Sequence, residues 1–519
     1  MSTRGAVAAG HPLTAEAGAA VLREGGNAVD AAVAAVLTSF VTESPLTGLG
    51  AGGFMLVHAP GEQDVLLDFF VEVPGRTSTE RRSELVPIPV YFSPESPQVF
   101  NVGAASCGVP GTAAGLAEAL RRYGSLPLAE LVQEPARLAR EGVRVNAEQA
   151  FIFHILEPIL THEPQGRAIY APQGRILDEG DLFRFEELGD ALERYGAEGP
   201  EPFYGGDIGR RLSSWVLDRG GTLGRDDLAA YEPQHRDPVR ARYRGRDVLT
   251  NPPPSSGGIL IALALSVLDR AGPADLPTLV AAMEEAQVAR TEAFFHGLYS
   301  DGYAAEFLSG ARIDAAAERV RAGTRPPDPG PEPPAERLGS TTHITAVDGD
   351  GRCASVTCSN GTGSGVIVPG TGVHVNNMLG EEDLNPLGFH VTPAGRRVPS
   401  MMSPTVVLRD GELVAGLGSG GSNRIRSAVL QTILRLIDEG MDVQAAVEAP
   451  RVHFEAGAVQ AEPGIEAGLD QLAARGYQLV RWQERNLFFG GVHAIARDPG
   501  SGAIQGGGDP RRGGAVALV

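Results

Sequence analysis

The hydrophobic pattern predicts helices and strands that alternate along the first part of the chain. Two alanine-rich segments, 14–24 and 28–41, have helical character and are separated by Gly25-Gly26-Asn27. Glycine often ends a helix and asparagine often caps the next one, so we expect two closely packed helices here. Strands are predicted at 54–59 and 65–70, and further helices at 110–123, 126–141, 206–219 and 257–271.

The later part of the chain begins with strands. Two hairpins are predicted, in which a turn rich in Gly and Asp joins two strand-like segments: 343–348 with 353–359, and 405–408 with 412–416. A helix is predicted at 423–439, because its apolar residues fall four apart: Ile425, Val429, Ile433 and Ile437. Strands that are followed by helices and then by strands again predict stacked layers of α and β structure.

A proline-rich segment separates these two parts. Residues 325–334 read R-P-P-D-P-G-P-E-P-P. Proline has no amide N–H and a fixed φ, so this segment can form neither a helix nor a central strand. We therefore expect an exposed, extended tether over about residues 322–339, which divides the chain into residues 1–340 and 341–519.

The composition narrows the class of protein. Hydrophobic residues make up 42% of the chain, and no segment reaches the roughly 18 uninterrupted apolar residues of a membrane span. The first residues lack the basic-then-apolar pattern of a secretory signal, so we expect a soluble, cytoplasmic protein with no membrane partner. The net charge of −20 argues against nucleic acid as a partner. The three cysteines, Cys107, Cys353 and Cys358, are too few for a disulfide framework and do not have the spacing of zinc ligands. We expect them to be small side chains that fill space in the core.

Thr341 is a candidate nucleophile because of where it stands. It follows the tether directly and precedes the first strand of the second part. A threonine hydroxyl is a weak nucleophile, and one way to activate it is to free its own α-amino group, which then serves as the base. A flexible segment upstream would let the released carboxyl end move away. Taken alone, Thr-Thr-His before a strand is weak evidence, since threonine favours strands.

Motifs along the whole chain strengthen this hypothesis. In the second part they are Thr341-Thr342-His343, Gly363-Ser364-Gly365-Val366, Asn376-Asn377, Met402-Ser403-Pro404-Thr405, Gly418-Ser419-Gly420-Gly421-Ser422 and Asp509-Pro510-Arg511. In the first part they are Gly25-Gly26-Asn27-Ala28-Val29-Asp30, Gly52-Gly53-Phe54-Met55, Val109-Pro110-Gly111-Thr112 and Pro252-Pro253-Pro254-Ser255-Ser256-Gly257-Gly258. In this order they resemble the large and small subunits of gamma-glutamyltransferases, from about residue 5 to the C-terminus.

The resemblance implies a fold and a chemistry. The fold would be the four-layer αββα sandwich of the N-terminal nucleophile hydrolases. Autocleavage between Ser340 and Thr341 would give a large subunit, 1–340, and a small catalytic subunit, 341–519. Thr341 would then attack an amide and pass the acyl group to water or an amine. Gly420 and Gly421 match the family's oxyanion-hole pair, and Ser359 matches a threonine that hydrogen-bonds the nucleophile. No metal or organic cofactor is implied.

The same comparison shows departures in the acyl pocket. The family's Asp-Phe-Arg-Glu, whose arginine binds the α-carboxylate of the γ-glutamyl group, is replaced by a sequence with Phe70 at the arginine's position. A serine pair becomes Ser400-Met401, Met378 stands where the family has Gln or Glu, and Glu381 is the one carboxylate that remains for the α-amino group. The segment around Asn360 is about two residues shorter than usual, so its match to the family's ligand asparagine is open.

Alternatives therefore remain for substrate and assembly. The substrate is either a γ-glutamyl compound or another, less charged amide, because losing a charged partner in a buried site costs about 2–5 kcal/mol. A non-enzymatic relative that keeps the fold is the alternative from another class. The acceptor and the oligomeric state stay open, a homodimer of processed heterodimers being one alternative.

Overall fold

Two antiparallel sheets form the centre of the molecule. The computed structural model describes residues 5–77, 82–93, 96–326 and 340–519. In the larger sheet the strand order is β22-β1-β11-β12-β2-β3-β8. Its strands are β1 Gly5–Ala9, β2 Gly52–His58, β3 Val65–Phe69, β8 Gln234–Arg236, β11 Thr342–Asp348, β12 Cys353–Ser359 and β22 Ala515–Leu518.

The second sheet lies face to face with the first. Its order is β21-β20-β16-β15-β10-β9. The strands are β9 Val239–Tyr243, β10 Arg246–Thr250, β15 Thr405–Arg409, β16 Glu412–Gly420, β20 Gly491–Arg497 and β21 Ile504–Gly508. Strands β11 and β12 pack against β16, so the two hairpins that the sequence predicts meet across the centre of the sandwich.

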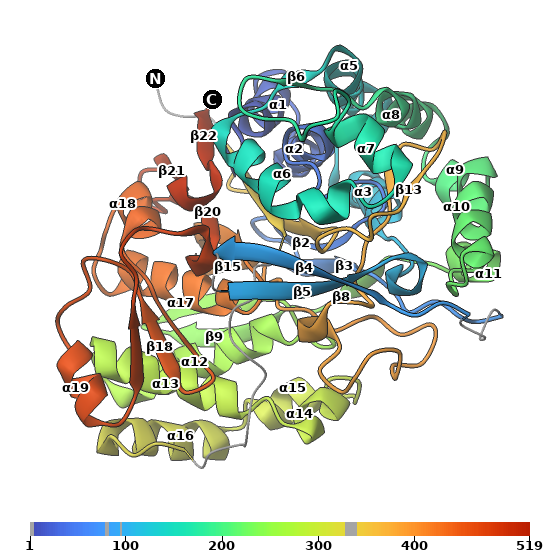
Figure 1. Ribbon diagram of the computed structural model, residues 1–519. Helices are drawn as coiled ribbons and strands as arrows, with labels where there is room; N and C mark the ends of the chain where they lie inside the picture. Colours follow the sequence, from blue (N-terminus) through green and yellow to red (C-terminus); the bar gives the residue numbers. More distant parts are fainter. Residues whose placement is uncertain (1–4, 78–81, 94–95, 327–339) are drawn as a thin grey trace.

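Helices cover the outer faces of both sheets. The larger sheet is covered by α1 Pro12–Arg23, α2 Ala28–Thr42 and α3 Thr112–Tyr123. The second sheet is covered by α12 Gly257–Ala271, α17 Arg424–Ile437 and α18 Val443–Glu448. Figure 1 shows α1, α2 and α3 above the central strands and α12 below them, with α18 at the left of the view. The four-layer αββα arrangement that the family resemblance implies is therefore confirmed.

The remaining helices extend these outer layers. They are α4 Leu128–Leu131, α5 Gln133–Glu141, α6 Ala147–Leu160, α7 Pro164–Tyr170, α8 Glu186–Glu198, α9 Glu201–Tyr204, α10 Asp207–Asp218, α11 Arg225–Ala229, α13 Leu276–Val288, α14 Glu292–Gly297, α15 Tyr303–Phe307, α16 Gly310–Ala322 and α19 Leu469–Ala474. Within the described part of the chain, no helix has the length and apolar character that crossing a membrane requires.

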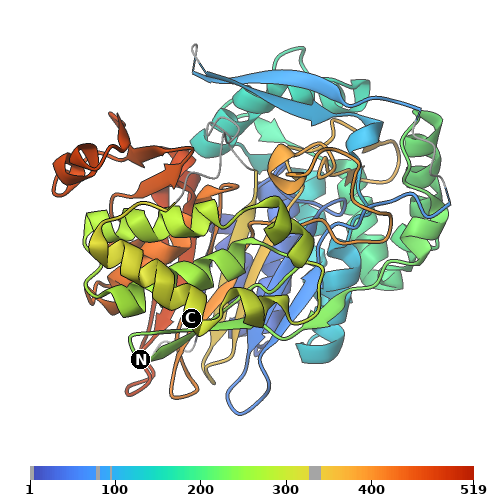
Figure 2. The ribbon, with the colours of Figure 1, turned by 90° about the horizontal axis from the view of Figure 1, so that it is seen from below.

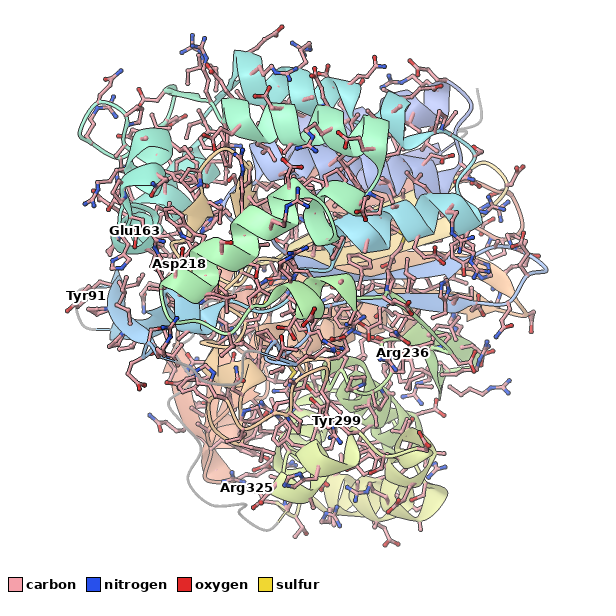
Figure 3. The ribbon with its side chains drawn as sticks, turned by 90° about the vertical axis from the view of Figure 1, so that its right-hand side faces the viewer. Tyr91, Glu163, Asp218, Arg236, Tyr299 and Arg325 are labelled. Carbon is pink, nitrogen blue, oxygen red and sulfur yellow. The ribbon has the colours of Figure 1, made fainter. Side chains whose placement is uncertain are left out.

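Four small sheets complete the molecule. Their strands are β4 Val86–Ser93 with β5 Ser96–Val102, β6 Val143–Arg144 with β7 Leu182–Phe183, β13 Ile367–Val368 with β14 Val373–His374, and β17 Val452–Glu455, β18 Ala458–Ala461 and β19 Gln478–Arg481 together. The β4–β5 hairpin forms a long arm along one end of the molecule (Figure 2). Tyr91, which lies on this arm and is 60% exposed, stands at the margin of the side-chain view (Figure 3).

The two ends of the described chain lie in one sheet. Strand β1 pairs with β11 on one side and with β22 on the other, so the N-terminal strand sits between the strand that follows Thr341 and the C-terminal strand. Figure 2 shows the chain ends next to each other. All five residues of β1 are buried, and the hydrophobic clusters on both faces of this sheet contain residues from before and after Thr341, so the two parts of the chain pack as one body. Sequence periodicity gave no sign of β1.

Local signals placed most of the elements that they predicted within one or two residues. Asn27 caps α2 through a capping box, and Gly25 has φ of +97°, a left-handed value that suits glycine at a helix end. The helix predicted at 126–141 is wrong as one element, since it is broken at Val132 into α4 and α5. Pro135 explains the break, because it has no N–H to donate to the carbonyl four residues earlier.

Two further expectations concern the cysteines and the proline-rich tether. The three cysteines are free and buried, as predicted. The proline-rich tether lies, for residues 327–339, outside the described residues, and Arg325 near its start is labelled in Figure 3.

Candidate active site

Thr341 stands at the end of the central sheet, one residue before β11. Its side chain is 6% exposed. The β11–β12 register pairs Thr342 with Cys358, which brings the next residue of β12, Ser359, to Thr341. The Thr341 hydroxyl donates a hydrogen bond of 3.2 Å to Ser359 Oγ. The pairing of two strands thus places the predicted supporting hydroxyl on the predicted nucleophile.

Ser359 also contacts the peptide bond that is predicted to be cleaved. Its hydroxyl donates to the carbonyl oxygen of Ser340 at 2.6 Å, and its oxygen accepts the Gly361 N–H at 3.0 Å. Donation to a carbonyl draws electron density from the carbon and makes it a better electrophile. One serine therefore orients the attacking oxygen and polarises the bond under attack.

Gly420, the last residue of β16, lies against Thr341, and Gly421 follows it in the chain. A Cβ atom added to Gly420 would overlap the Thr341 carbonyl oxygen. Gly421 has φ of +126°, a conformation that residues with side chains rarely adopt, and an added Cβ would lie 3.0 Å from the Gly490 Cα. Both positions require glycine, and helix α17 begins at Arg424, close after them. Backbone amides that approach without obstruction at a helix start suit an oxyanion.

A small cavity of about 40 Å³ opens on one side of Thr341. It is lined by five of the six residues that the sequence assigned to the acyl pocket: Phe70, Met378, Glu381, Ser400 and Met401. Phe70 is 1% exposed and stacks on Phe54 with 5.2 Å between ring centres. The family's arginine position therefore presents an aromatic ring, which is held in place by another ring, to the nucleophile.

Asn360 is the exception among these predicted residues. It is fully buried, but its amide donates to the His374 carbonyl at 3.3 Å and does not line the cavity. Gly361 lines the cavity in its place. The shorter segment explains the difference, because it turns directly after β12 and leaves Asn360 facing β14. The assignment of Asn360 to substrate binding stays a prediction, with its Nδ2 engaged by His374.

Asp383 is a carboxylate that sequence reasoning missed. It lines the same cavity and accepts hydrogen bonds from Ser422 Oγ and from Asn423 Nδ2, the latter at 3.4 Å. Glu381 is thus not the one acid near the acyl pocket. Burial raises the pKa of Glu381 to about 7, and its Oε1 accepts the Thr362 N–H at 3.2 Å. No local motif marks Asp383, because it lies in a loop that only the fold brings to Ser422.

Glu43 is a second acid near the nucleophile that the sequence did not reveal. It lies at the end of α2, is 7% exposed, and accepts hydrogen bonds from Thr342 Oγ1 and, at 3.0 Å, from Thr14 Oγ1. Burial raises the pKa of its carboxyl to about 7, against smaller opposing effects of the two threonines and of Arg512. Two buried histidines nearby stay neutral at pH 7, since burial lowers the pKa of His493 to about 4 and that of His343 well below its ordinary value.

This arrangement can perform acyl transfer. A hydroxyl nucleophile, a hydroxyl that supports it, unobstructed backbone amides and a pocket for the acyl group meet at one peptide bond. The polar network that includes Glu43 fixes the residue after the nucleophile.

Comparisons with known proteins identify relatives of the whole chain. Residues 14–519 match the family model described as gamma-glutamyltranspeptidase. The chain is 33% identical to the acylase ACY 1 proenzyme of Pseudomonas sp. (strain SE83), a match that covers 96% of this chain and 90% of that protein. It is 32% identical to the glutathione hydrolase proenzyme of Escherichia coli (strain K12), with 98% and 90% covered.

A solved structure agrees with the fold. The cephalosporin acylase of Bacillus halodurans superposes with a TM-score of 0.83 at 27% identity, and the match covers 99% of this chain and 96% of that one. The relatives thus include both acylases and glutathione hydrolases, which leaves the substrate class open. With its fold, its nucleophile position and its full-length match, this chain belongs to the gamma-glutamyltranspeptidase family and is an enzyme of that family's hydrolase and transferase type.

Proposed function

We propose that this chain is a self-processing threonine acylase that removes a short acyl group without a carboxylate from an amine. One observation carries the proposal. Among the described residues that line the acyl pocket there is no arginine, lysine or histidine, while two acids, Glu381 and Asp383, do line it. A pocket with this charge disfavours the α-carboxylate of a γ-glutamyl group.

Processing comes first. Thr341 Oγ attacks the Ser340 carbonyl carbon, and the C–N bond to Thr341 breaks as the nitrogen takes up the hydroxyl proton, which leaves an ester. Water then hydrolyses the ester, giving a carboxyl end at Ser340 and a free α-amino group at Thr341. The 2.6 Å hydrogen bond from Ser359 to the Ser340 carbonyl supports this step.

Turnover reuses the same oxygen. Thr341 Oγ attacks the substrate carbonyl, its proton passes to the free α-amino group and then to the departing amine, and an acyl ester forms on Thr341. Water adds to the ester, so that one amide and one water give one carboxylic acid and one amine. The amides at Gly420 and Gly421 would receive the negative oxygen of both tetrahedral intermediates, and the close approach of Gly420 to Thr341 supports this role.

The size and polarity of the pocket favour a short, apolar acyl group. A buried water needs about 10–15 Å³ on this scale, so about 40 Å³ holds roughly three atoms beyond the carbonyl carbon. Phe70, Met378 and Met401 are each no more than 2% exposed and supply apolar surface. A linear butyryl group fits this description. A γ-glutamyl group is larger, and its carboxylate would have no charged partner in this pocket. Loss of such a partner costs about 2–5 kcal/mol of binding free energy, which lowers the affinity by tens to thousands of fold.

A panel of p-nitroanilides tests the proposal. Acetyl, butyryl, hexanoyl, glutaryl and γ-glutamyl p-nitroanilides are compared by kcat/KM on processed protein, with Thr341→Ala as the control for background hydrolysis. Butyryl should exceed γ-glutamyl and glutaryl by at least about tenfold. Thr341-dependent turnover that is fastest for γ-glutamyl would overturn the assignment of the acyl group and leave the nucleophile in place.

The γ-glutamyl compounds remain the second candidate because of a specific observation. Glu381 and Asp383 lie where a substrate ammonium could be held, and one relative is named a glutathione hydrolase. The same panel decides between the two.

A further inference from the structure

Thr341 lies between two cavities, and a buried acid lines the larger of them. The larger cavity has a volume of about 400 Å³ and shares Ser340 and Thr341 with the small acyl pocket. Glu43, at the end of helix α2, lines this cavity together with Thr341 and Thr342. The steps of processing and turnover do not use this carboxyl as an acid or a base, so it can act on the nucleophile through its contacts and its charge.

The carboxyl of Glu43 joins three elements at the start of β11. Its Oε2 accepts a hydrogen bond from Thr342 Oγ1, and its Oε1 accepts one of 3.0 Å from Thr14 Oγ1 of α1. The Thr14 hydroxyl lies 2.7 Å from that of Thr42, the last residue of α2. A Cβ atom added to Gly10 would overlap Oε2, so the carboxyl is enclosed on this side as well. The residue that follows the nucleophile is therefore held by a carboxyl with little room to turn.

The loop after Glu43 holds the neighbouring strand. The Leu46 N–H donates to the Glu43 carbonyl at 2.9 Å, and the Leu46 carbonyl accepts the Asn360 N–H at 2.8 Å. Asn360 directly follows Ser359, whose hydroxyl accepts the hydrogen bond from Thr341. This short loop thus connects the start of β11 with the end of β12, and these two strand ends carry the nucleophile and its supporting hydroxyl.

Glu43 also brings a negative charge to this place. Burial raises the pKa of its carboxyl to about 7, so the carboxylate form predominates above that pH. Arg512 supplies the opposite charge: a Cβ atom added to Gly420 would lie 3.4 Å from Arg512 Nη1 and would also overlap the Thr341 carbonyl oxygen. Arg512 stays charged at neutral pH, since burial lowers its pKa only to about 10, and it attracts Glu43. A cation near an α-amino group weakens that amine as a base, and an anion strengthens it.

Among the described residues, the other titratable groups around Glu43 are neutral, paired or exposed. Burial lowers the pKa of the neighbouring imidazoles and raises the pKa of a thiol and a phenol, so all of these stay uncharged near pH 7: His11, His343, His493, Cys358 and Tyr170. The remaining charged residues of the cavity are either paired within the protein, as Arg511 is with Glu462, or exposed at the rim: Glu148, Glu484 and Arg485. The charge of Glu43 is therefore opposed mainly by Arg512.

We propose that Glu43 is a positioning residue for the reaction of Thr341. Its hydrogen bond with Thr342 holds the nucleophile against Ser359, since a shift of Thr342 would move the residue bonded to it. Its carboxylate offsets the charge of Arg512, so that the freed α-amino group remains an effective base. The inference rests on the proposed role of Thr341 and holds for any acyl group.

Thr342→Val tests the contact. Valine has nearly the same shape and donates no hydrogen bond, so the rate of self-processing and kcat should each fall by about tenfold, while KM changes by less than about twofold. Thr342→Ser keeps the hydroxyl and should restore most of both rates. Thr38→Val is the matched control, because Thr38 is a buried threonine of α2 whose hydroxyl donates to Ala34 within the helix. A Thr342→Val enzyme with unmodified processing and kcat would overturn the positioning role.

Glu43→Gln tests the charge. The amide oxygen can still accept the hydrogen bond from Thr342, whereas the negative charge is lost. In the free enzyme the rising limb of kcat/KM against pH reports the amine that must lose its proton. This limb should move to lower pH by at least about half a pH unit, because the ammonium form loses its nearby anion. Glu148→Gln removes an exposed acid at the rim of the same cavity and should leave the limb in place, since solvent screens that charge. A limb that stays in place or moves to higher pH in Glu43→Gln would overturn the role of the charge.

Labelling of the chain end needs no turnover and separates this inference from the proposed function. A trace of acetic anhydride acetylates the neutral form of the Thr341 α-amino group, and mass spectrometry of the small subunit's first peptide measures the extent at each pH. The pH of half-maximal labelling should be lower in Glu43→Gln than in the unmodified protein. Equal values would refute the inference even if the whole amide panel were hydrolysed. A lower value in a protein that hydrolyses none of the amides would refute the proposed function and uphold the role of Glu43.

Discussion

The Ser359 hydroxyl donates a 2.6 Å hydrogen bond to the carbonyl oxygen of Ser340, the residue whose bond to Thr341 is predicted to be cut. Ser359 Oγ in turn accepts a hydrogen bond of 3.2 Å from the Thr341 hydroxyl. A side chain that joins the nucleophile to its first target can affect self-processing before any substrate is present.

Ser359→Ala should therefore slow processing. Loss of a buried donor costs about 1–3 kcal/mol, or about 5- to 150-fold in rate. A gel time course measures the conversion of the 54.3 kDa chain into residues 1–340 and 341–519. Ser359→Thr, which keeps a hydroxyl, is the control and should be processed at nearly the normal rate. An alanine variant that matches the unmodified rate would show that Ser359 has no part in this step.

Gly420→Ala should abolish or severely slow both processing and turnover. The added methyl group would overlap the Thr341 carbonyl oxygen. Gly310→Ala is the control, because the nearest atom to a Cβ there is 3.9 Å away and the residue begins helix α16. Thermal unfolding of both variants separates a loss of fold from a loss of activity. Normal processing of Gly420→Ala would place the nucleophile elsewhere.

Phe70→Arg should shift the acyl preference toward γ-glutamyl. The variant places a cation in a pocket whose described residues include none, opposite a substrate carboxylate. The ratio of kcat/KM for γ-glutamyl over butyryl p-nitroanilide should rise by at least about tenfold. Phe70→Leu controls for loss of the Phe54 stack, since it removes the ring and adds no charge. If both variants changed the ratio equally, a charge effect would be excluded.

Glu43 predicts a specific dependence of stability on pH. Its folded pKa of about 7 lies above the ordinary value of 4.5, so the folded state binds this proton more tightly than the unfolded state does. The stability contribution is present below about pH 4.5 and is lost as the pH rises toward 7, by about 3 kcal/mol in all. In Glu43→Gln the side-chain amide oxygen can still accept the hydrogen bond from Thr342, but the side chain does not bind or release a proton in this pH range.

Urea unfolding of both proteins at several pH values measures this difference. The unfolding free energy of the unmodified protein, minus that of Glu43→Gln, should fall between pH 4.5 and 7 and stay level above. A difference that does not change with pH would mean that Glu43 has an ordinary pKa in the folded protein.

Much of the chemistry could be predicted from the sequence because its signals are local. A hairpin turn, a capping asparagine and a glycine pair each act within a few residues, so β11 with β12, helix α2 and the Gly420-Gly421 site were found from short motifs. The strand register then fixed the contact between Thr341 and Ser359, as the motif order indicated.

Other features required the tertiary structure, because they join residues that are distant in the chain. Asp383 in one loop accepts a hydrogen bond from Ser422 in another. Glu43, at the end of a helix, accepts a hydrogen bond from Thr342, which lies 299 positions later in the chain. Asn360 is likewise joined to a distant residue, since its amide donates to the carbonyl of His374 in β14. Loop geometry depends on packing and not on residue type alone.

The sequence by itself determined the apolar character at positions 70, 378 and 401, which follows from residue identity, and the order of its motifs predicted the nucleophile and the residues that support it. Only the tertiary structure decided that Thr341 lies between two cavities, and that Arg512 lines the larger one. A cavity is the space left when helices and loops from separate parts of the chain pack together, and no local pattern records its size or its charge.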